Sequence, residues 1–181
     1  GNNRLLAGLG NDTLYGGDGN DLLSVNTDAV GFANVKLVGP ETFNSITIAS
    51  GGKVSVVPMA NESNVLRTTS LLITGTGVLD LVNNPMILDY SGATPIGAIS
   101  ALMSSGYNNG AWNGAGIRAS SAASAPGRTY GYVEASAILA VFPGTFAGQS
   151  IDNTSILFRH TQVGDTDLDR FAGVGRLGGV A

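Results

Sequence analysis

Short runs of alternating apolar and polar residues follow one another through the first half of the chain. Each run is bounded by Gly, Asn, Pro or Ser. A period of two is typical of β-strands with one buried face. The predicted strands are residues 34–38, 45–49, 53–57, 70–74, 78–82 and 86–90. Their lengths and spacing predict an all-β region.

Two of these runs repeat each other. Residues 48–56 align with residues 73–81 at an offset of 25 residues (73 − 48 = 25), with apolar residues on alternate positions around a glycine corner. Periods of about 20 to 50 residues are typical of solenoids. We therefore expect a parallel β-roll or right-handed β-helix, a solenoid that continues through residues 25–92. The alternative is a β-sandwich in which each of these paired runs forms a hairpin.

The pattern becomes mixed after residue 92. Thr94 suits an N-cap, Pro95 suits the first helical position, and the apolar positions that follow share one face. Gly106 predicts a left-handed end to this helix. The remaining predicted elements are a second short helix at 132–141 and strands at 146–147 and 155–160. The expected class is all-β with minor α, in which residues 93–163 cap the solenoid with one or two short helices.

The first 24 residues repeat with a period of nine. Residues 16–24 and 7–15 follow the pattern G-G-x-G-x-D-x-L-x, and a partial copy precedes them. The aspartate position, followed two residues later by an inward-pointing leucine, is occupied by Asn3, Asp12 and Asp21 (12 − 3 = 21 − 12 = 9). Turn glycines, among them Gly17 and Gly19, permit left-handed turns and a close approach of carbonyl oxygens to an ion. Aspartate supplies the hard oxygen ligands that suit Ca²⁺.

These nonapeptides resemble the RTX family of secreted proteins. The resemblance implies an ion between turns two repeats apart, so that Asp21 pairs with the turn carrying Asn3. Asp12 would need a partner at Val30, and the nearest acid, Asp28, lies two residues out of register. We therefore expect at most one complete site. The alternative is that these turns begin a solenoid without binding an ion.

Motifs later in the chain resemble the C-terminal part of large secreted β-helix repeat proteins of planctomycete-type bacteria. They are L-x-x-N-x-x-I-x-D-Y-x-G at 81–92, G-Y-N-x-G-x-W-x-G-x-G-I at 106–117, G-Y-x-E-A at 131–135 and G-D-x-x-x-D from residue 164. The resemblance implies an extracellular surface or matrix protein.

The tail at residues 164–181 begins with alternating acids. Asp165, Asp167 and Asp169 stand at positions one, three and five of a calcium loop of the EF-hand or dockerin type. Arg170 replaces the glycine of position six, and Arg176 replaces the glutamate of position twelve. A degenerate calcium loop and a solvated acidic turn both remain open.

The composition argues against several classes of function. Only 12% of the residues are charged and the formal net charge is −4, so a basic patch for nucleic acid or an anionic membrane is not expected. No apolar run is long enough for membrane insertion. The chain has no cysteine and a single histidine, His160. Asp80 and Asp89 are the only pair of acidic residues expected at similar positions in successive turns of the solenoid. Glycoside cleavage needs two facing carboxylates, so we do not expect an enzyme.

We therefore expect a secreted structural protein, extracellular or at the cell surface, that acts as a surface, adhesive or fibre-forming subunit. Calcium is the expected cofactor. The open first coil predicts a homo-oligomer or filament with head-to-tail contacts to the tail at 171–181 of a neighbour. The alternative is a β-helix that binds or cleaves carbohydrate, in which Tyr107 and Trp112 stack on a sugar ring of a surface glycan. An aromatic plug at the end of the solenoid explains the same pair without a ligand.

Overall fold

The computed structural model describes residues 1–15, 19, 21–26, 31–58 and 64–170. This part of the protein is mostly β with two α-helices, as the sequence predicts. Its strands form an eight-stranded sheet, a five-stranded sheet and a two-stranded hairpin. Neither larger sheet closes on itself.

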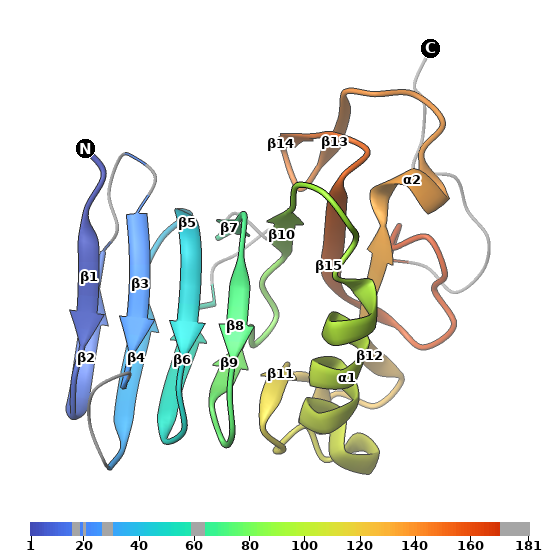
Figure 1. The fold of residues 1–181 in the computed structure, drawn as a ribbon. Helices are drawn as coiled ribbons and strands as arrows, with labels where there is room; N and C mark the ends of the chain where they lie inside the picture. The colour runs from blue at the N-terminus through green and yellow to red at the C-terminus, as the bar shows by residue number, and fades with distance from the viewer. Residues whose placement is uncertain (16–18, 20, 27–30, 59–63, 171–181) are drawn as a thin grey trace.

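From its first strand to β11 the chain passes back and forth between the two larger sheets, except that residues 66–68 and 71–73 form two successive strands of the eight-stranded sheet (Figure 1). All strand pairs in this region are parallel. In the eight-stranded sheet these strands are β1 (Arg4–Ala7), β3 (Asp21–Val25), β5 (Glu41–Ile48), β7 (Leu66–Thr68), β8 (Leu71–Ile73) and β10 (Met86–Asp89). In the five-stranded sheet they are β2 (Gly10–Leu14), β4 (Ala33–Leu37), β6 (Gly52–Val56), β9 (Val78–Asp80) and β11 (Gly116–Arg118).

The predicted 25-residue offset is confirmed by the strand register. Ile48 lies beside Ile73 in one sheet and Val54 lies beside Leu79 in the other, and both pairs are parallel. All four side chains except that of Ile73 are fully buried. The β-sandwich alternative is wrong, because β5 and β6 belong to different sheets and do not form a hairpin. Each of the six strands predicted in the first half overlaps a strand of the structure.

The C-terminal half extends the eight-stranded sheet with antiparallel strands. β15 (Ser155–Gln162) pairs with β10 on one side and with β12 (Arg128–Glu134) on the other. The predicted segments 1–24, 25–92 and 93–163 therefore share one sheet. The other elements are α1 (Ile96–Tyr107), the 3₁₀ turns η2 (Asn108–Gly110) and η3 (Ala122–Ser124), α2 (Ala135–Ile138), β13 (Gly144–Phe146) and β14 (Gln149–Ile151).

The predicted helix near residue 96 is confirmed, but its end differs from the prediction. Gly106 lies inside α1, and Asn108 takes the left-handed conformation with φ 41°. A Cβ at Gly106 would lie 1.8 Å from the carbonyl oxygen of Ile117. Glycine is therefore needed here for the close approach of α1 to β11, and α1 covers the last strand of the five-stranded sheet.

The second predicted helix, at 132–141, is mostly wrong. Residues up to Glu134 belong to β12 because they pair with β15 along its length. Only the turn α2 is helical, and it directs Ala135 into a second apolar cluster with Ile138 and Leu139 at its margin. Pairing with a long neighbouring strand has overridden the local amphipathic pattern. Neither α1 nor α2, the α-helices of the described residues, is long and apolar enough to cross a membrane.

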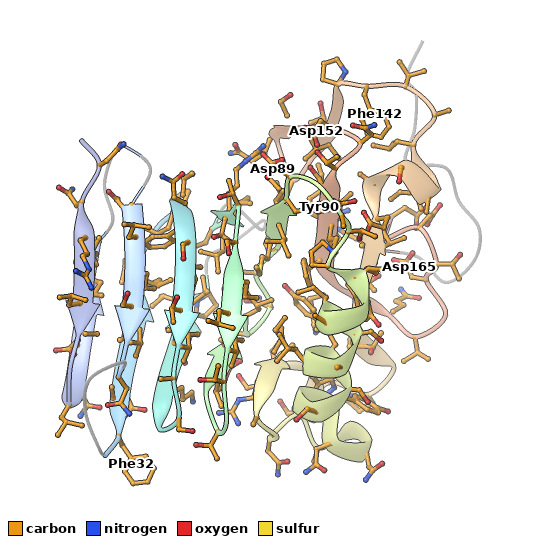
Figure 2. All side chains as sticks on the ribbon, viewed as in Figure 1. Phe32, Asp89, Tyr90, Phe142, Asp152 and Asp165 are labelled. Atoms are coloured by element: carbon orange, nitrogen blue, oxygen red, sulfur yellow. The ribbon has the colours of Figure 1, made fainter. Side chains whose placement is uncertain are left out.

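Charged side chains join the hairpin β13–β14 to the main sheet. Arg67 donates to Asp89 at 2.5 Å and to a backbone carbonyl of β14 at 2.8 Å. Asp152 lies at the same end of the sheet as Asp89 (Figure 2). Burial acts to raise the pKa of Asp152, but hydrogen bonds from Thr154 and Ser155, together with the Arg67 charge, hold the pKa below its ordinary value.

Candidate functional sites

The first candidate site lies where two glycine-rich turns stack at the beginning of β1 and β3. Asp21 is completely buried, and its Oδ1 accepts a hydrogen bond of 2.6 Å from the backbone N–H of Asn3. The N–H of Leu22 in turn donates to the carbonyl oxygen of Asn3 at 2.9 Å. The predicted pairing of Asp21 with the turn that carries Asn3, two nonapeptides earlier (21 − 3 = 18), is confirmed.

The second oxygen of this carboxylate has no protein partner. Asp21 Oδ2 is buried and accepts no hydrogen bond among the described residues. Leaving such a group unsatisfied costs about 1–3 kcal/mol, and more when the group is charged. Gly19 has φ +129°, and a Cβ there would lie 2.5 Å from the carbonyl oxygen of Gly1. The Gly1 carbonyl oxygen therefore lies against Gly19, two residues before Asp21, and carbonyl and carboxylate oxygens are both hard ligands that fit Ca²⁺. Gly17 lies outside the described residues.

Asp12 is not part of a stacked turn in the described residues. It lies on β2 beside Val35, 23 residues later (35 − 12 = 23), so the predicted partner position at Val30 is wrong. The chain between β2 and β4 is longer than two nonapeptides, which shifts the register. Val30 and Asp28 lie outside the described residues. The inward direction of the leucines is confirmed, because Leu23 is buried and Leu5 and Leu14 pack against the core.

The second candidate site is the acidic turn that follows β15 (Figure 2). Carboxylate oxygens of Asp165, Asp167 and Asp169 lie within 4.8 Å of one another. Asp165 accepts hydrogen bonds from the Thr161 hydroxyl, from the Asp167 N–H at 3.2 Å and from the Arg170 N–H at 2.8 Å. Asp167 is only 7% exposed, and neither of its oxygens accepts a hydrogen bond among the described residues.

The three acids differ in their proton affinity. Burial raises the pKa of Asp167, and the adjacent Asp165 and Asp169 carboxylates raise it further. Burial acts on Asp165 in the same direction, but its hydrogen bonds from Thr161, Arg170 and Asp167 hold its pKa below the ordinary value. A buried carboxyl between two anions is stabilised either by a proton or by a cation. The donor set contains only oxygens and therefore fits a hard cation such as Ca²⁺.

The backbone of this turn has the conformation of a calcium loop at position six, although the sequence lacks the usual glycine there. Arg170 stands where a calcium loop has glycine, and it nevertheless takes the left-handed conformation, with φ 85°. The Arg159 guanidinium donates to the carbonyl oxygen of Leu168 at 2.5 Å and lies 4.5 Å from the centre of the Phe146 ring. These contacts attach the turn to β15. Arg176 lies outside the described residues.

Tyr107 and Trp112 lie together, as the carbohydrate alternative requires. Their rings meet edge to face with centroids 5.1 Å apart, and the backbone N–H of Trp112 donates to the backbone carbonyl of Tyr107 at 2.9 Å. Trp112 is only 5% exposed and belongs to the main core, whereas Tyr107 is 45% exposed. Tyr130 and Tyr132 line the same pocket and were missed by sequence reasoning. Their spacing of two residues on a strand was the available signal, since it places both on one face.

The acids considered for catalysis are engaged in ion pairs. Asp89 pairs with Arg67. Asp80 Oδ2 lies 3.5 Å from Arg118 Nε and 3.8 Å from Lys53 Nζ, and Asp80 Oδ1 accepts the Ser120 N–H at 3.1 Å. Asp80 therefore ties β9 to both of its neighbours in the five-stranded sheet.

The first candidate site lies within a segment that matches a known protein family. Residues 1–28 match the RTX calcium-binding nonapeptide repeat (4 copies). The N-terminal segment consists of RTX calcium-binding repeats. Such repeats are typical of secreted calcium-binding proteins. Comparison with curated proteins and with solved structures finds no match. The resemblance of the later motifs to planctomycete β-helix proteins and to a dockerin loop gains no support from these comparisons.

Proposed function

We propose that this protein is a secreted, extracellular structural protein whose parallel coils form a calcium-stabilised β-solenoid. The observation that carries the proposal is the stacked turn at Asn3 and Asp21, where a buried carboxylate oxygen has no partner in the part of the chain that the structure describes. The RTX match of residues 1–28 supports calcium as the missing partner. The passage of most successive strands from one of the two larger sheets to the other, with parallel pairing among β1 to β11, supports the solenoid.

At this site Asp21 and the carbonyl oxygens of the two turns would hold the ion. Calcium supplies positive charge that offsets the buried carboxylate. It would also link the first coil, which consists of β1 and β2, to the second coil, which consists of β3 and β4. Because the same turns are separated in the unfolded chain, the binding energy adds directly to folding. The order of the first coil should then depend on calcium.

We propose a second calcium site at Asp165, Asp167 and Asp169. It is supported by the close approach of the three carboxylates and by the buried, unpartnered oxygens of Asp167. A bound cation would allow Asp167 to be ionised inside the fold. It would also connect the acidic turn to β15, which already holds the turn through Arg159.

Calcium stoichiometry tests both sites separately. Native mass spectrometry of the whole chain should find two calcium ions, and Asp21→Asn and Asp167→Asn should each retain one. Asp12→Asn is the matched control, because it changes the same repeat position without a stacked partner, and it should retain two. A wild-type protein that binds no calcium would contradict the proposal. Loss of one ion in only one of the two variants would restrict calcium binding to that site.

The structural role also predicts a contact at the N-terminal end. β1 and β2 are the first strands of the two sheets, and each pairs with a single strand among the described residues. Nine large apolar side chains of the described residues are exposed, and five of them lie between residues 6 and 32. One of these, Phe32, protrudes from the turn that leads into β4, at the bottom of the view in Figure 2. Open strand edges beside apolar side chains favour pairing with another strand.

We propose that this edge joins a second copy of the chain. At the opposite end α1 covers the five-stranded sheet, so a head-to-tail contact would join β1 to the β12 end of the eight-stranded sheet. Leu6→Lys places a charge on β1 at a side chain that is 56% exposed, and it should lower the association constant measured by sedimentation. Leu72→Lys on β8, at 54% exposed, is the control and should associate like wild type. A monomeric wild-type chain at high concentration would contradict the assembly proposal.

We also propose that the protein is not an enzyme. Asp80 and Asp89, the acids near matching rungs, are each held by a basic side chain. A reducing-sugar assay with polysaccharide substrates should therefore detect no turnover. Turnover abolished by Asp80→Asn or Asp89→Asn in a folded variant would favour the carbohydrate-cleaving alternative.

A further inference from the structure

Most of the large amphipathic aromatic side chains of this protein gather around one cavity. The chain has five tyrosines and one tryptophan. Three of those tyrosines and the tryptophan line a cavity of about 230 Å³ between α1 and β12: Tyr107, Trp112, Tyr130 and Tyr132. This concentration lies at the end of the molecule opposite the RTX repeats (Figure 1).

The aromatic residues of the cavity wall are fixed by contacts with one another and with residues behind them. Trp112 adopts a left-handed backbone with φ 49° and packs edge to face on Tyr107. The Tyr130 hydroxyl donates to the carbonyl oxygen of Asn84, and the Tyr132 ring stacks on Phe158 with centroids 6.2 Å apart. A wall that is ordered before binding loses little conformational entropy when a ligand enters.

The polar groups of the cavity are neutral hydroxyls. No charged residue lines it, and Ser100, Ser104 and Thr129 contribute hydroxyl groups. Within the described residues, these three side chains and the Tyr107 hydroxyl make no hydrogen bond to protein. Hydroxyls beside an exposed aromatic ring suit a ligand that has an apolar face and a rim of hydroxyl groups.

We propose that this cavity binds one ring of a neutral saccharide, with its apolar face against Tyr107. Its volume lies below the range of about 300–1,000 Å³ that holds larger ligands, so it has room for one sugar ring. No carboxylate lines the cavity. Since glycoside cleavage requires two carboxylates at the bond, the cavity binds sugar without cleaving it. This goes beyond the calcium-dependent structural role and would direct the structural protein to a surface glycan.

Saturation-transfer NMR with the whole chain and the methyl glycosides of glucose, galactose, mannose and N-acetylglucosamine tests the proposal. At least one should bind, and methyl glucuronoside should bind more weakly because nothing in the cavity offsets its charge. Tyr107→Ala should weaken binding about tenfold, since an aromatic contact contributes about 0.5–1.5 kcal/mol beyond its area. Tyr107→Phe keeps the ring and should stay within about threefold of wild type.

Tyr15→Ala, at the exposed tyrosine of the opposite end, is the matched control and should leave sugar binding unchanged. Circular dichroism would establish that each variant is folded. The proposal is overturned if none of the four neutral glycosides binds to wild type. It is also overturned if the Tyr107→Ala variant binds as tightly as wild type, or if the glucuronoside binds as tightly as the neutral sugars. The sugar experiment is carried out in chelator as well, so that its result is independent of the calcium sites.

Discussion

The Asp21→Asn substitution should leave the contact between β1 and β3 at least as stable as in wild type in chelator, and less stable than in wild type when calcium is added. The buried Oδ2 of Asp21 has no partner among the described residues, so in chelator the removal of its charge relieves about 1–3 kcal/mol. The substitution also weakens the charge-assisted bond from the Asn3 N–H by about 1 kcal/mol. The variant should therefore be as stable as wild type or more stable by up to about 2 kcal/mol.

Calcium should stabilise the contact between β1 and β3 in wild type but not in Asp21→Asn. At a free concentration a hundredfold above Kd, an ion that binds only the folded turn adds about 2.7 kcal/mol. The relevant hydrogen bonds are those from β3 to β1, in which Leu22 donates to Asn3 at 2.9 Å and Asn26 donates to Ala7 at 3.0 Å. Stabilisation of this size slows exchange of the two amide protons about 100-fold.

Hydrogen exchange read by NMR measures this effect residue by residue. Calcium should slow the Leu22 and Asn26 amides in wild type and in Asp12→Asn, and leave them unchanged in Asp21→Asn. The Gly116 amide, which donates to Gly77 at 2.8 Å in a distant coil, is the internal reference. Equal slowing in wild type and Asp21→Asn would refute the reasoning, because the ion would then bind without this carboxylate.

Three further substitutions test the packing described above. Asp80→Ala should lower the free energy of unfolding in urea by about 3–5 kcal/mol, because it leaves Arg118, whose side chain is 16% exposed, without its carboxylate partner; a loss below about 1 kcal/mol would show that water replaces the pair. The pKa of Asp152 is depressed in the fold, so its stabilisation is present above the unfolded pKa and is lost as the pH falls through the folded pKa. Asp152→Asn should consequently cost less than about 1 kcal/mol at pH 7 and nothing at low pH, and a cost that grows on acidification would contradict the sign. Gly106→Ala should lower the thermal midpoint by an amount equivalent to about 1–3 kcal/mol, despite the better helix propensity of alanine, because its Cβ would overlap the Ile117 carbonyl; an unchanged midpoint would indicate that α1 can move away from β11.

The strands of the first half were predictable because their pattern and their packing agree. Alternation directs every second side chain into the core, and the 25-residue period recurs as a strand register. The pairing of Asp21 with Asn3 was predictable for the same reason, since the nonapeptide spacing fixes which turns stack. In each case the local pattern already contains the long-range contact.

The C-terminal half was less predictable because its partners are distant in sequence. The hydrophobic spacing after Tyr132 is compatible with a helix, and only the presence of β15 selects a strand up to Glu134. Gly106 carries the usual signal of a helix end, but it serves the close contact with Ile117 instead. The pocket likewise depends on β12 lying beside α1, which no local signal specifies.

Buried polar side chains differ between the first and the later passages of the chain from the five-stranded sheet to the eight-stranded sheet. Asp21, Asn64 and Asn84 are completely buried where the chain passes from the five-stranded sheet to the eight-stranded sheet. Asn64 donates its side-chain amide to the carbonyl of Val57 at 2.6 Å, and Asn84 donates to the carbonyl of Val56 at 3.1 Å. A neutral amide can donate to carbonyl oxygens directly, whereas a buried carboxylate only accepts and needs a cation beside such oxygens. Under the proposed function, Asp21 in the first passage therefore depends on a cation, whereas Asn64 and Asn84 in the later passages link neighbouring segments by direct hydrogen bonds.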